Sequence, residues 1–500
     1  MTCLQAARDG LKYAWVDTCC IDKSSSAELS EAINSMFRWY KRATICYVFL
    51  SDLVVSSEFQ DDLELQARLE HCRWFTRAWT LQELIAPSHI KFYNQEWKYC
   101  FTKEMALNVL ARITGIDVDI LNHDKDLSVA SVAQKMSWAA NRQATRIEDV
   151  AYSLLGIFGI NMPMLYGEEE RAFLRLQTEI IGSSPDPTIL AWMYALEDSP
   201  TYINTEKSYS GVMASSPRAF RKCAQVTSLL DRSLFDSTMS NRGIRLRARF
   251  ALLPLARGLP SRKAEGYCLA LPVCRIQDTV YGVRLRNIGS GRFVRQNAYG
   301  LVPIDLREVV HWHVLDPFLL PQLPPPSTKA KDNQNLILEH RQCVLEVMLP
   351  PGMEVYRRWP WQQWDEQDTL FFGPNRQPED VGWISLKVVA SPPYPFHDRD
   401  APKSIDFLFY AFDWARQPGS GAPPRWTIHR VRGSVDDRAM EQMNHEAVKD
   451  GWNAYWVANR LMINRVSEKH FFIGGTSGED VLLLHRPPTP SSEGIKSRLG

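Results

Sequence analysis

The chain has 500 residues and a formal net charge of +1, from 58 lysines and arginines against 57 aspartates and glutamates. This length exceeds what one hydrophobic core supports and predicts two or three domains. The charge balance argues against a broad attraction to nucleic acid or anionic membranes. No apolar run approaches the roughly 20 residues that cross a bilayer. The start, MTCLQAARDGLKY, lacks the basic and apolar regions of a secretory signal.

The ten cysteines are scattered, without a C-x-x-C pair or a regular spacing. This distribution indicates neither a disulfide framework nor a zinc ribbon, and no metal site is predicted. Reduced thiols in a cytoplasmic protein are the simplest interpretation.

The N-terminal part alternates strand and helix patterns. Tyr13–Ile21 is mostly apolar and predicts a buried parallel strand. Ser25 and Glu28 can form a capping box for the helix that follows. Thr44–Ser51 predicts the next strand, so the segment is a βαβ unit with a parallel sheet. The predicted helix carries apolar residues at helical spacing: Leu29, Ile33, Met36, Phe37 and Tyr40.

Further elements follow in chain order. Trp74–Pro87 predicts a helix that ends before its proline, and His89–Gln95 predicts a third strand. From Lys103 to Ile181 the pattern is nearly all helical, with Gly159 as the C-cap of one helix. The segment Gly182–Thr188, GSSPDPT, is predicted as a domain boundary.

After this boundary, short β-like runs between turn residues predict an antiparallel β-rich domain. A proline-rich polar insertion is predicted over residues 319–335, and a disordered tail over residues 486–500. The β-like runs are GIRLRARFAL, GYCLALPVCRI, GRFVRQ, RQCVLEVML and FLFYAFDW.

The segment YAWVDTCCIDK carries the first candidate chemistry. In a strand, Cys19 and Cys20 point to opposite faces, so one of them could line a site at the end of the sheet. A nucleophilic thiol would need a base such as His71 or His89; burial of unreactive thiols at the strand end is the favoured alternative. Two aspartates flank the strand end, and they either cap the next helix or hold a ribose or a basic partner: Asp17 and Asp22.

The segment RWFTRAWTLQELIAP is the second candidate. In a helix, Trp79 and Glu83 lie four residues apart on one face, and Arg73 and Arg77 form another such pair. One interpretation is a surface ion pair between Glu83 and an arginine. The other places Glu83 in a cleft, where its carboxylate binds ribose hydroxyls or stabilises a cationic sugar transition state. Both interpretations stay open at this point.

Three segments of the chain resemble the HET (heterokaryon incompatibility) domain of fungal proteins. The first is YAWVDTCCIDKSSSAELSEAINSMFRWYKRATICYVFLSDL, the second RWFTRAWTLQELIAP, and the third TRIEDVAYSLLGIFGINMPMLYGE. Their order and spacing also match. The positions that recur in the family are Asp17, Cys20, Ile21, Asp22, Arg77, Trp79, Gln82, Glu83, Asp149, Tyr152, Leu155 and Gly156.

The resemblance implies a cytoplasmic module that triggers programmed cell death in self/non-self recognition. The implied fold is α/β, with a TIR-like or flavodoxin-like parallel sheet. Some TIR domains cleave NAD with a glutamate carried on a helix, and Glu83 matches that residue by position. The implied partners are other HET-domain or incompatibility proteins and a second copy of this chain, without nucleic acid or a membrane span. No cofactor is implied, and NAD would be a substrate.

Family members usually begin several dozen residues earlier, with an additional strand, so the sheet is expected to be incomplete and the domain N-terminally truncated. The predicted function is incompatibility signalling through assembly of HET domains. The alternatives are an NAD-cleaving enzyme that uses Glu83 and an inactive truncated paralogue. The predicted domains are a HET domain over residues 1–120, a helical continuation over 121–183, a β-rich accessory domain over 188–485, and the tail.

Overall fold

The protein is described by a computed structural model. Two compact units are formed, the first by Met1–Leu253, Leu269–Leu285 and Arg295–Leu323, and the second by the remaining residues. The domain boundaries expected from the sequence stay predictions. The structure describes residues 1–54, 61–195, 208–229, 235–254, 267–288, 291–305, 307, 309, 311–315, 317–323, 344–348, 353–359, 364–365, 370–372, 381–388, 407–415, 425–432 and 480–483.

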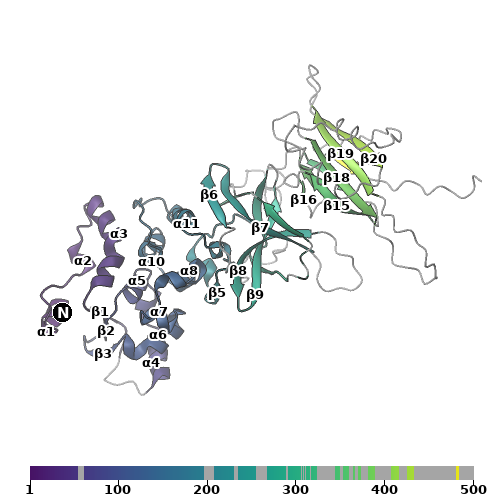
Figure 1. The fold of residues 1–500 in the computed structure, drawn as a ribbon. Coiled ribbons are helices and arrows are strands. Elements are labelled where there is room, and N and C mark those ends of the chain that lie inside the picture. The colour runs from purple at the N-terminus through teal and green to yellow at the C-terminus, as the bar shows by residue number, and fades with distance from the viewer. Residues whose placement is uncertain are drawn as a thin grey trace, which may run out of the picture. The chain divides into compact units, whose positions relative to one another are not determined.

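The N-terminal part is a mixed α/β arrangement around a small sheet (Figure 1). Its three strands have the order β1-β2-β3; β1 and β2 run parallel, and β3 is antiparallel to β2. The α/β class and two of the expected strands are confirmed, whereas a TIR-like or flavodoxin-like sheet stays a prediction. The elements are α1 Thr2–Arg8, α2 Asp17–Cys20, α3 Ser26–Arg42, β1 Cys46–Phe49, α4 Asp62–Leu69, η1 Arg73–Thr76, α5 Thr80–Ile85, β2 Ile90–Tyr93 and β3 Tyr99–Thr102.

The two faces of this sheet differ in character. Val48 of β1 is opposite Phe92 of β2, and both are fully buried. Tyr47 is opposite Lys91, and since side chains alternate along a strand, this pair lies on the other face. Helix α1 covers part of that second face, where the Tyr47 hydroxyl donates a hydrogen bond to Asp9 (2.7 Å). The sheet therefore has one apolar core face and one polar, aromatic face.

Helix α3 begins where the sequence predicts. The Ser25 hydroxyl accepts a hydrogen bond from the Glu28 backbone N–H (3.3 Å). The Glu28 carboxylate accepts from the backbone N–H of Asp22 (2.9 Å) and not from that of Ser25. Only half of the expected capping box therefore forms, and the other half ties the helix to the preceding turn.

The prediction of a buried strand over Tyr13–Ile21 is wrong. Tyr13 is 90% exposed, and the segment ends in the single helical turn α2, in which the Cys20 N–H donates to the carbonyl of Val16 (2.9 Å). A strand needs a neighbour for its backbone polar groups. Among the residues that the structure describes, no strand pairs with this segment, and a local turn satisfies those groups instead.

The continuous helix predicted over Trp74–Pro87 is also wrong. It is divided into η1 and α5 by Arg77, whose backbone is extended (φ −83°, ψ 141°). Gln143 explains the break, because its carbonyl accepts from the Ala78 N–H (2.8 Å) and its N–H donates to the Thr76 carbonyl (2.6 Å). A tertiary backbone pairing replaces one turn of helix.

The helical region after Lys103 is confirmed. Gly159 ends one of its helices in the left-handed conformation (φ 67°), as expected for a C-cap. The elements are η2 Glu104–Ala106, α6 Leu107–Thr114, α7 Val118–Leu121, η3 Leu127–Val129, α8 Val132–Ala139, α9 Asp149–Tyr152, α10 Leu155–Phe158 and α11 Arg171–Ser183. Two short helices lie beyond the predicted helical region, η4 Pro187–Leu190 and η7 Pro217–Phe220.

The predicted β-rich character is confirmed in the strands that follow. Ten of them form one sheet in which β7 pairs with β6, β12 and β13. The tail and most of the proline-rich insertion lie outside the described residues. The strands are β4 Tyr209–Ser210, β5 Val226–Thr227, β6 Asp236–Ser240, β7 Gly243–Pro254, β8 Tyr267–Ile276, β9 Thr279–Asn287, β10 Arg292–Gln296, β11 Val302–Pro303, β12 His311–Leu315 and β13 Phe318–Leu319.

The remaining described strands form two sheets of four strands each, with the orders β16-β17-β14-β21 and β15-β18-β19-β20. They are β14 Val344–Met348, β15 Met353–Trp359, β16 Trp364–Asp365, β17 Leu370–Phe372, β18 Val381–Val388, β19 Phe407–Ala415, β20 Arg425–Arg432 and β21 Asp480–Leu483. Among the helices that the structure describes, none is both long and apolar enough to span a membrane.

Helix α10 approaches α3 closely at Gly156. A Cβ atom added there would lie 2.1 Å from the Cβ of Phe37, a separation that packed atoms cannot adopt. We therefore expect Gly156→Ala to lower the free energy of unfolding by about 1–3 kcal/mol, the usual cost of overpacking. Gly182→Ala in α11 is the matched control, because nothing lies within 4 Å of its added Cβ. Thermal unfolding of both variants checks this, and equal effects would contradict it.

Candidate functional site

Glu83 is the centre of the candidate site. It lies in α5, where Leu81, Leu84 and Ile85 are buried, and its own side chain keeps part of its surface accessible. The carboxylate accepts hydrogen bonds from Trp74 of η1 and Tyr40 of α3. These donors come from a segment directly before α5 and from a helix far away in the sequence.

Burial raises the pKa of Glu83 from its ordinary value of 4.5 to about 7. The positive charge of Arg77 opposes this shift, the negative charge of Asp17 adds to it, and the two hydrogen bonds lower the pKa. Near neutral pH the carboxyl is therefore divided between its protonated and ionised forms. Such a group can exchange a proton or accept hydrogen bonds in its ionised form.

The charge of Glu83 reaches several buried groups. Burial raises the pKa of Tyr40 well above its usual range, and the nearby carboxylate raises it further. The pKa of the Cys46 thiol in β1 is raised by the same two causes in the same order. These shifts keep the tyrosine and the thiol neutral, as a hydrogen-bond donor and a core residue respectively.

Arg142 fixes the start of α5. Its buried guanidinium donates to the Thr80 hydroxyl (2.9 Å), to the Arg77 carbonyl (3.0 Å) and to the Trp138 carbonyl (3.2 Å). Burial lowers its pKa to about 10, while the negative charge of Glu83 raises it. This arginine therefore stabilises the backbone that carries Glu83 and supplies a positive charge to the same region.

Two residues beside Glu83 in the second sequence block connect it to other elements. Gln82 is buried and donates from its amide to the sulfur of Met36 in α3 (3.1 Å). Trp79 packs against the buried cluster of Ile21, Ala32 and Met36, and its indole donates to the carboxylate of Asp149. Gln82 and Trp79 thus hold α5 against its neighbours.

The third block lies around a loop and not around Glu83. The Tyr152 hydroxyl donates to Glu168 (2.8 Å) and accepts from the Leu165 backbone N–H (2.9 Å). Asp149 accepts from the Tyr166 hydroxyl (3.0 Å), and burial raises its pKa. The hydrogen bond between Asp149 and Trp79 connects this block to the segment that carries Glu83. Tyr152 itself bonds within the third block, where it holds the loop of Leu165 and Glu168 in place.

The residues of the first block do not form one site, because each has different contacts. Asp17 is close enough for its charge to act on both Glu83 and Tyr40. Asp22 accepts from the backbone and hydroxyl of Ser24 (2.9 and 2.6 Å), which lowers its pKa and closes a local turn. Cys20 is exposed, with its sulfur 4.0 Å from that of Cys19.

The histidines that the sequence offered as bases do not join these thiols within the described part of the chain. His89 lies 3.0 Å from the carboxylate of Glu104, and His71 is exposed. The same described residues hold no group of three or more His, Cys, Asp or Glu side chains suited to a metal ion.

Sequence reasoning missed three groups of the site: Tyr40, Trp74 and Arg142. Tyr40 lies on the apolar stripe of α3, so the sequence pattern predicted a packing role for it. Trp74 lies nine positions before Glu83, and Arg142 is far from both in the sequence. The one available signal was the crowding of arginine, tryptophan and glutamate in the second block.

Comparison with known proteins shows what the N-terminal part of this chain is similar to. Residues 1–63 match the family model described as heterokaryon incompatibility protein (HET). Vegetative incompatibility protein HET-E-1 of Podospora anserina is 47% identical over 178 residues, which are 35% of this chain and 13% of that protein. No solved structure matches this chain. The findings confirm the resemblance to HET-domain incompatibility proteins. The matched segment spans only a small part of the length of HET-E-1.

The raised pKa of Glu83 predicts a pH-dependent stability. The folded state favours the neutral acid, so wild-type stability relative to Glu83→Gln falls as pH rises from about 4.5 to about 7. Full ionisation costs about 3 kcal/mol, because the pKa differs by about 2.5 units between the folded and unfolded states. Urea unfolding of both proteins at several pH values checks this.

The matched control is Glu31→Gln on the exposed side of α3. A gap between Glu83→Gln and wild type that stays constant across this pH range would contradict the prediction.

Proposed function

We propose that this protein acts in heterokaryon incompatibility as a self/non-self recognition module that triggers cell death through assembly of HET domains. The observation that carries the proposal is the 47% identity over 178 residues to a vegetative incompatibility protein. The match to the HET family model over residues 1–63 supports it. Other incompatibility proteins and further copies of this chain are the proposed partners.

An exposed aromatic patch supports the assembly step. Trp15 contacts Trp39 and Tyr40 edge to face, with ring centroids 5.3 and 5.9 Å apart. Trp39 is 39% exposed and Trp15 is 37% exposed. Aromatic side chains are enriched where proteins associate, because they bury much area at a low entropic cost. The patch is therefore the surface that we assign to HET–HET contact.

Loss of this patch should weaken assembly. We expect the double variant Trp15→Ala/Trp39→Ala to shift the oligomer to at least about ten-fold higher protein concentration, since aromatic anchors often contribute 1–2 kcal/mol or more each. Leu63→Ser is the matched control, because Leu63 is an apolar residue of α4 that is 73% exposed. Light scattering over a concentration series checks this, with death after induction in fungal cells as the second measurement. A monomer at all concentrations that still kills cells would overturn the assembly proposal.

A second candidate is cleavage of NAD at Glu83. The observation that favours it is a partly accessible carboxyl with a pKa of about 7, bonded to Tyr40 and Trp74. The ionised carboxylate would accept hydrogen bonds from ribose hydroxyls and stabilise the cationic sugar. The bond between nicotinamide and ribose breaks, and nicotinamide leaves with the electron pair. Water then adds to the sugar and gives its proton to the Glu83 carboxylate.

The NAD proposal predicts loss of NAD in fungal cells after induction of the chain, and no loss with Glu83→Gln. Because the ionised form accepts these hydrogen bonds, nicotinamide release should increase as pH rises through about 7. Glu31→Gln is again the control and should act as wild type does.

Death without a fall in NAD would contradict the enzyme and leave the assembly proposal. A folded protein that causes neither death nor NAD loss would support the inactive alternative.

A further inference from the structure

The polar, aromatic face of the small sheet lies opposite the core face, on which Val48 and Phe92 are buried. Tyr47 and Phe49 of β1 and Lys91 and Tyr93 of β2 share this second face by their register. Helix α1 covers one end of it, where the Lys91 ammonium bonds to Asp9 (3.0 Å). The turn between β2 and β3 lies at the other end of this face.

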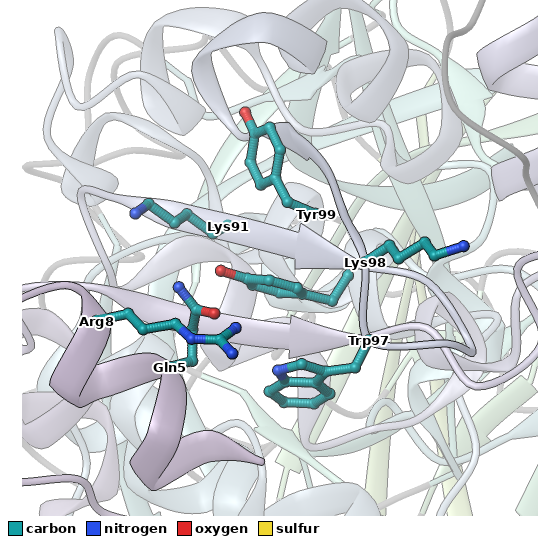
Figure 2. Close-up of a pocket in the computed structure, with 7 residues that line it drawn as sticks. Gln5, Arg8, Lys91, Trp97, Lys98 and Tyr99 are labelled. Atoms are coloured by element: carbon teal, nitrogen blue, oxygen red, sulfur yellow. The ribbon is translucent and has the colours of Figure 1, made fainter.

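A cavity of about 490 Å³ lies between α1 and this turn. Gln5 and Arg8 of α1 lie on one side together with Trp97, and the Tyr99 ring extends away from them on the other side (Figure 2). Tyr93 also lines the cavity, and its side chain is buried. The volume is within the range of cavities that hold small organic ligands.

The aromatic side of the cavity is held in a strained backbone. Trp97 adopts a positive φ of 59°, a backbone conformation that residues other than glycine and asparagine rarely adopt. Asn94 maintains it: its side-chain oxygen accepts from the N–H groups of Glu96 (3.0 Å) and Lys98 (2.9 Å), and its carbonyl accepts from the Trp97 N–H (2.9 Å). The turn stacks the Trp97 ring on Tyr93, with centroids 5.1 Å apart. Strain of this kind is often stored where a side chain serves a binding site.

The cations of the cavity are not equivalent. Lys91 is paired with Asp9, and Lys98 is paired with Glu96 (2.6 Å). Figure 2 shows the Lys98 side chain pointing away from the cavity and the Arg8 guanidinium extending over it. Within the described part of the chain, no carboxylate lies within 4 Å of the Arg8 guanidinium. Arg8 is therefore the group that is free to bind an anion.

We propose that this cavity binds a small molecule in which a planar ring carries a phosphate or carboxylate group. Trp97 would contact the ring, and the Arg8 guanidinium would pair with the anion through two parallel hydrogen bonds. The Gln5 amide beside them already donates to Asp9 (3.4 Å). A nucleoside monophosphate and an aromatic carboxylate share this chemistry. The site lies on the face of the sheet opposite the core side and does not depend on the chemistry proposed for Glu83.

The test is calorimetric titration of the full chain with adenosine monophosphate and with benzoate, and separately with adenosine and with inorganic phosphate. We expect saturable binding of at least one of the two ring anions, and at least ten-fold weaker binding of the half ligands. Added salt should weaken the binding, since the anion contact is electrostatic.

Three variants locate the site. Arg8→Gln should weaken binding at least ten-fold, whereas Arg171→Gln, at an exposed arginine of α11, should leave it unchanged. Trp97→Gly removes the ring but suits the positive φ, so it should abolish binding while the far-ultraviolet circular dichroism spectrum stays that of wild type. Absence of saturable binding by both ring anions would overturn the proposal. Binding that is equally affected by Arg8→Gln and Arg171→Gln, or insensitive to Trp97→Gly, would also overturn it.

Discussion

The geometry of the Glu83 site depends on one buried guanidinium. Arg142 donates to the Arg77 carbonyl, the Thr80 hydroxyl and the Trp138 carbonyl, and the adjacent Gln143 pairs with the backbone on either side of Arg77. A buried charge is costly unless its donors are bonded, so this arrangement has little freedom. It ends one helical turn and begins the next, and it thereby decides where Glu83 points.

The environment of Glu83 combines burial with opposing charges. Arg77 and the donors from Tyr40 and Trp74 stabilise the ionised form, while burial and Asp17 destabilise it. Because burial dominates, the carboxyl titrates near neutral pH and not near its ordinary value. A surface ion pair does not require such surroundings, whereas a strongly shifted pKa is common at sites that carry chemistry.

The two faces of the small sheet have different uses in this interpretation. The core face carries Val48 and Phe92, and the Phe92 ring contacts Trp74 of η1 edge to face. The other face bears the aromatic and basic side chains of the cavity near Trp97. The aromatic patch formed by Trp15 and by Trp39 of α3 is a third surface. The cavity residues are separate from the other two sites, whereas Tyr40 contacts Trp15 of the aromatic patch and also donates to Glu83.

The sequence by itself determined the local elements: the helix after Ser25, the strands of Thr44–Ser51 and His89–Gln95, the C-cap at Gly159 and the β-rich second part. Local patterns carry that information because capping, helical spacing and β-branched runs act over a few residues. Only the tertiary structure decided the rest. None of the described strands pairs with Tyr13–Ile21, and Gln143 broke the helix at Arg77 through a pairing more than sixty residues away. Tyr40 and Arg142 joined Glu83 for the same reason: contacts between distant segments leave no periodic signal in the sequence.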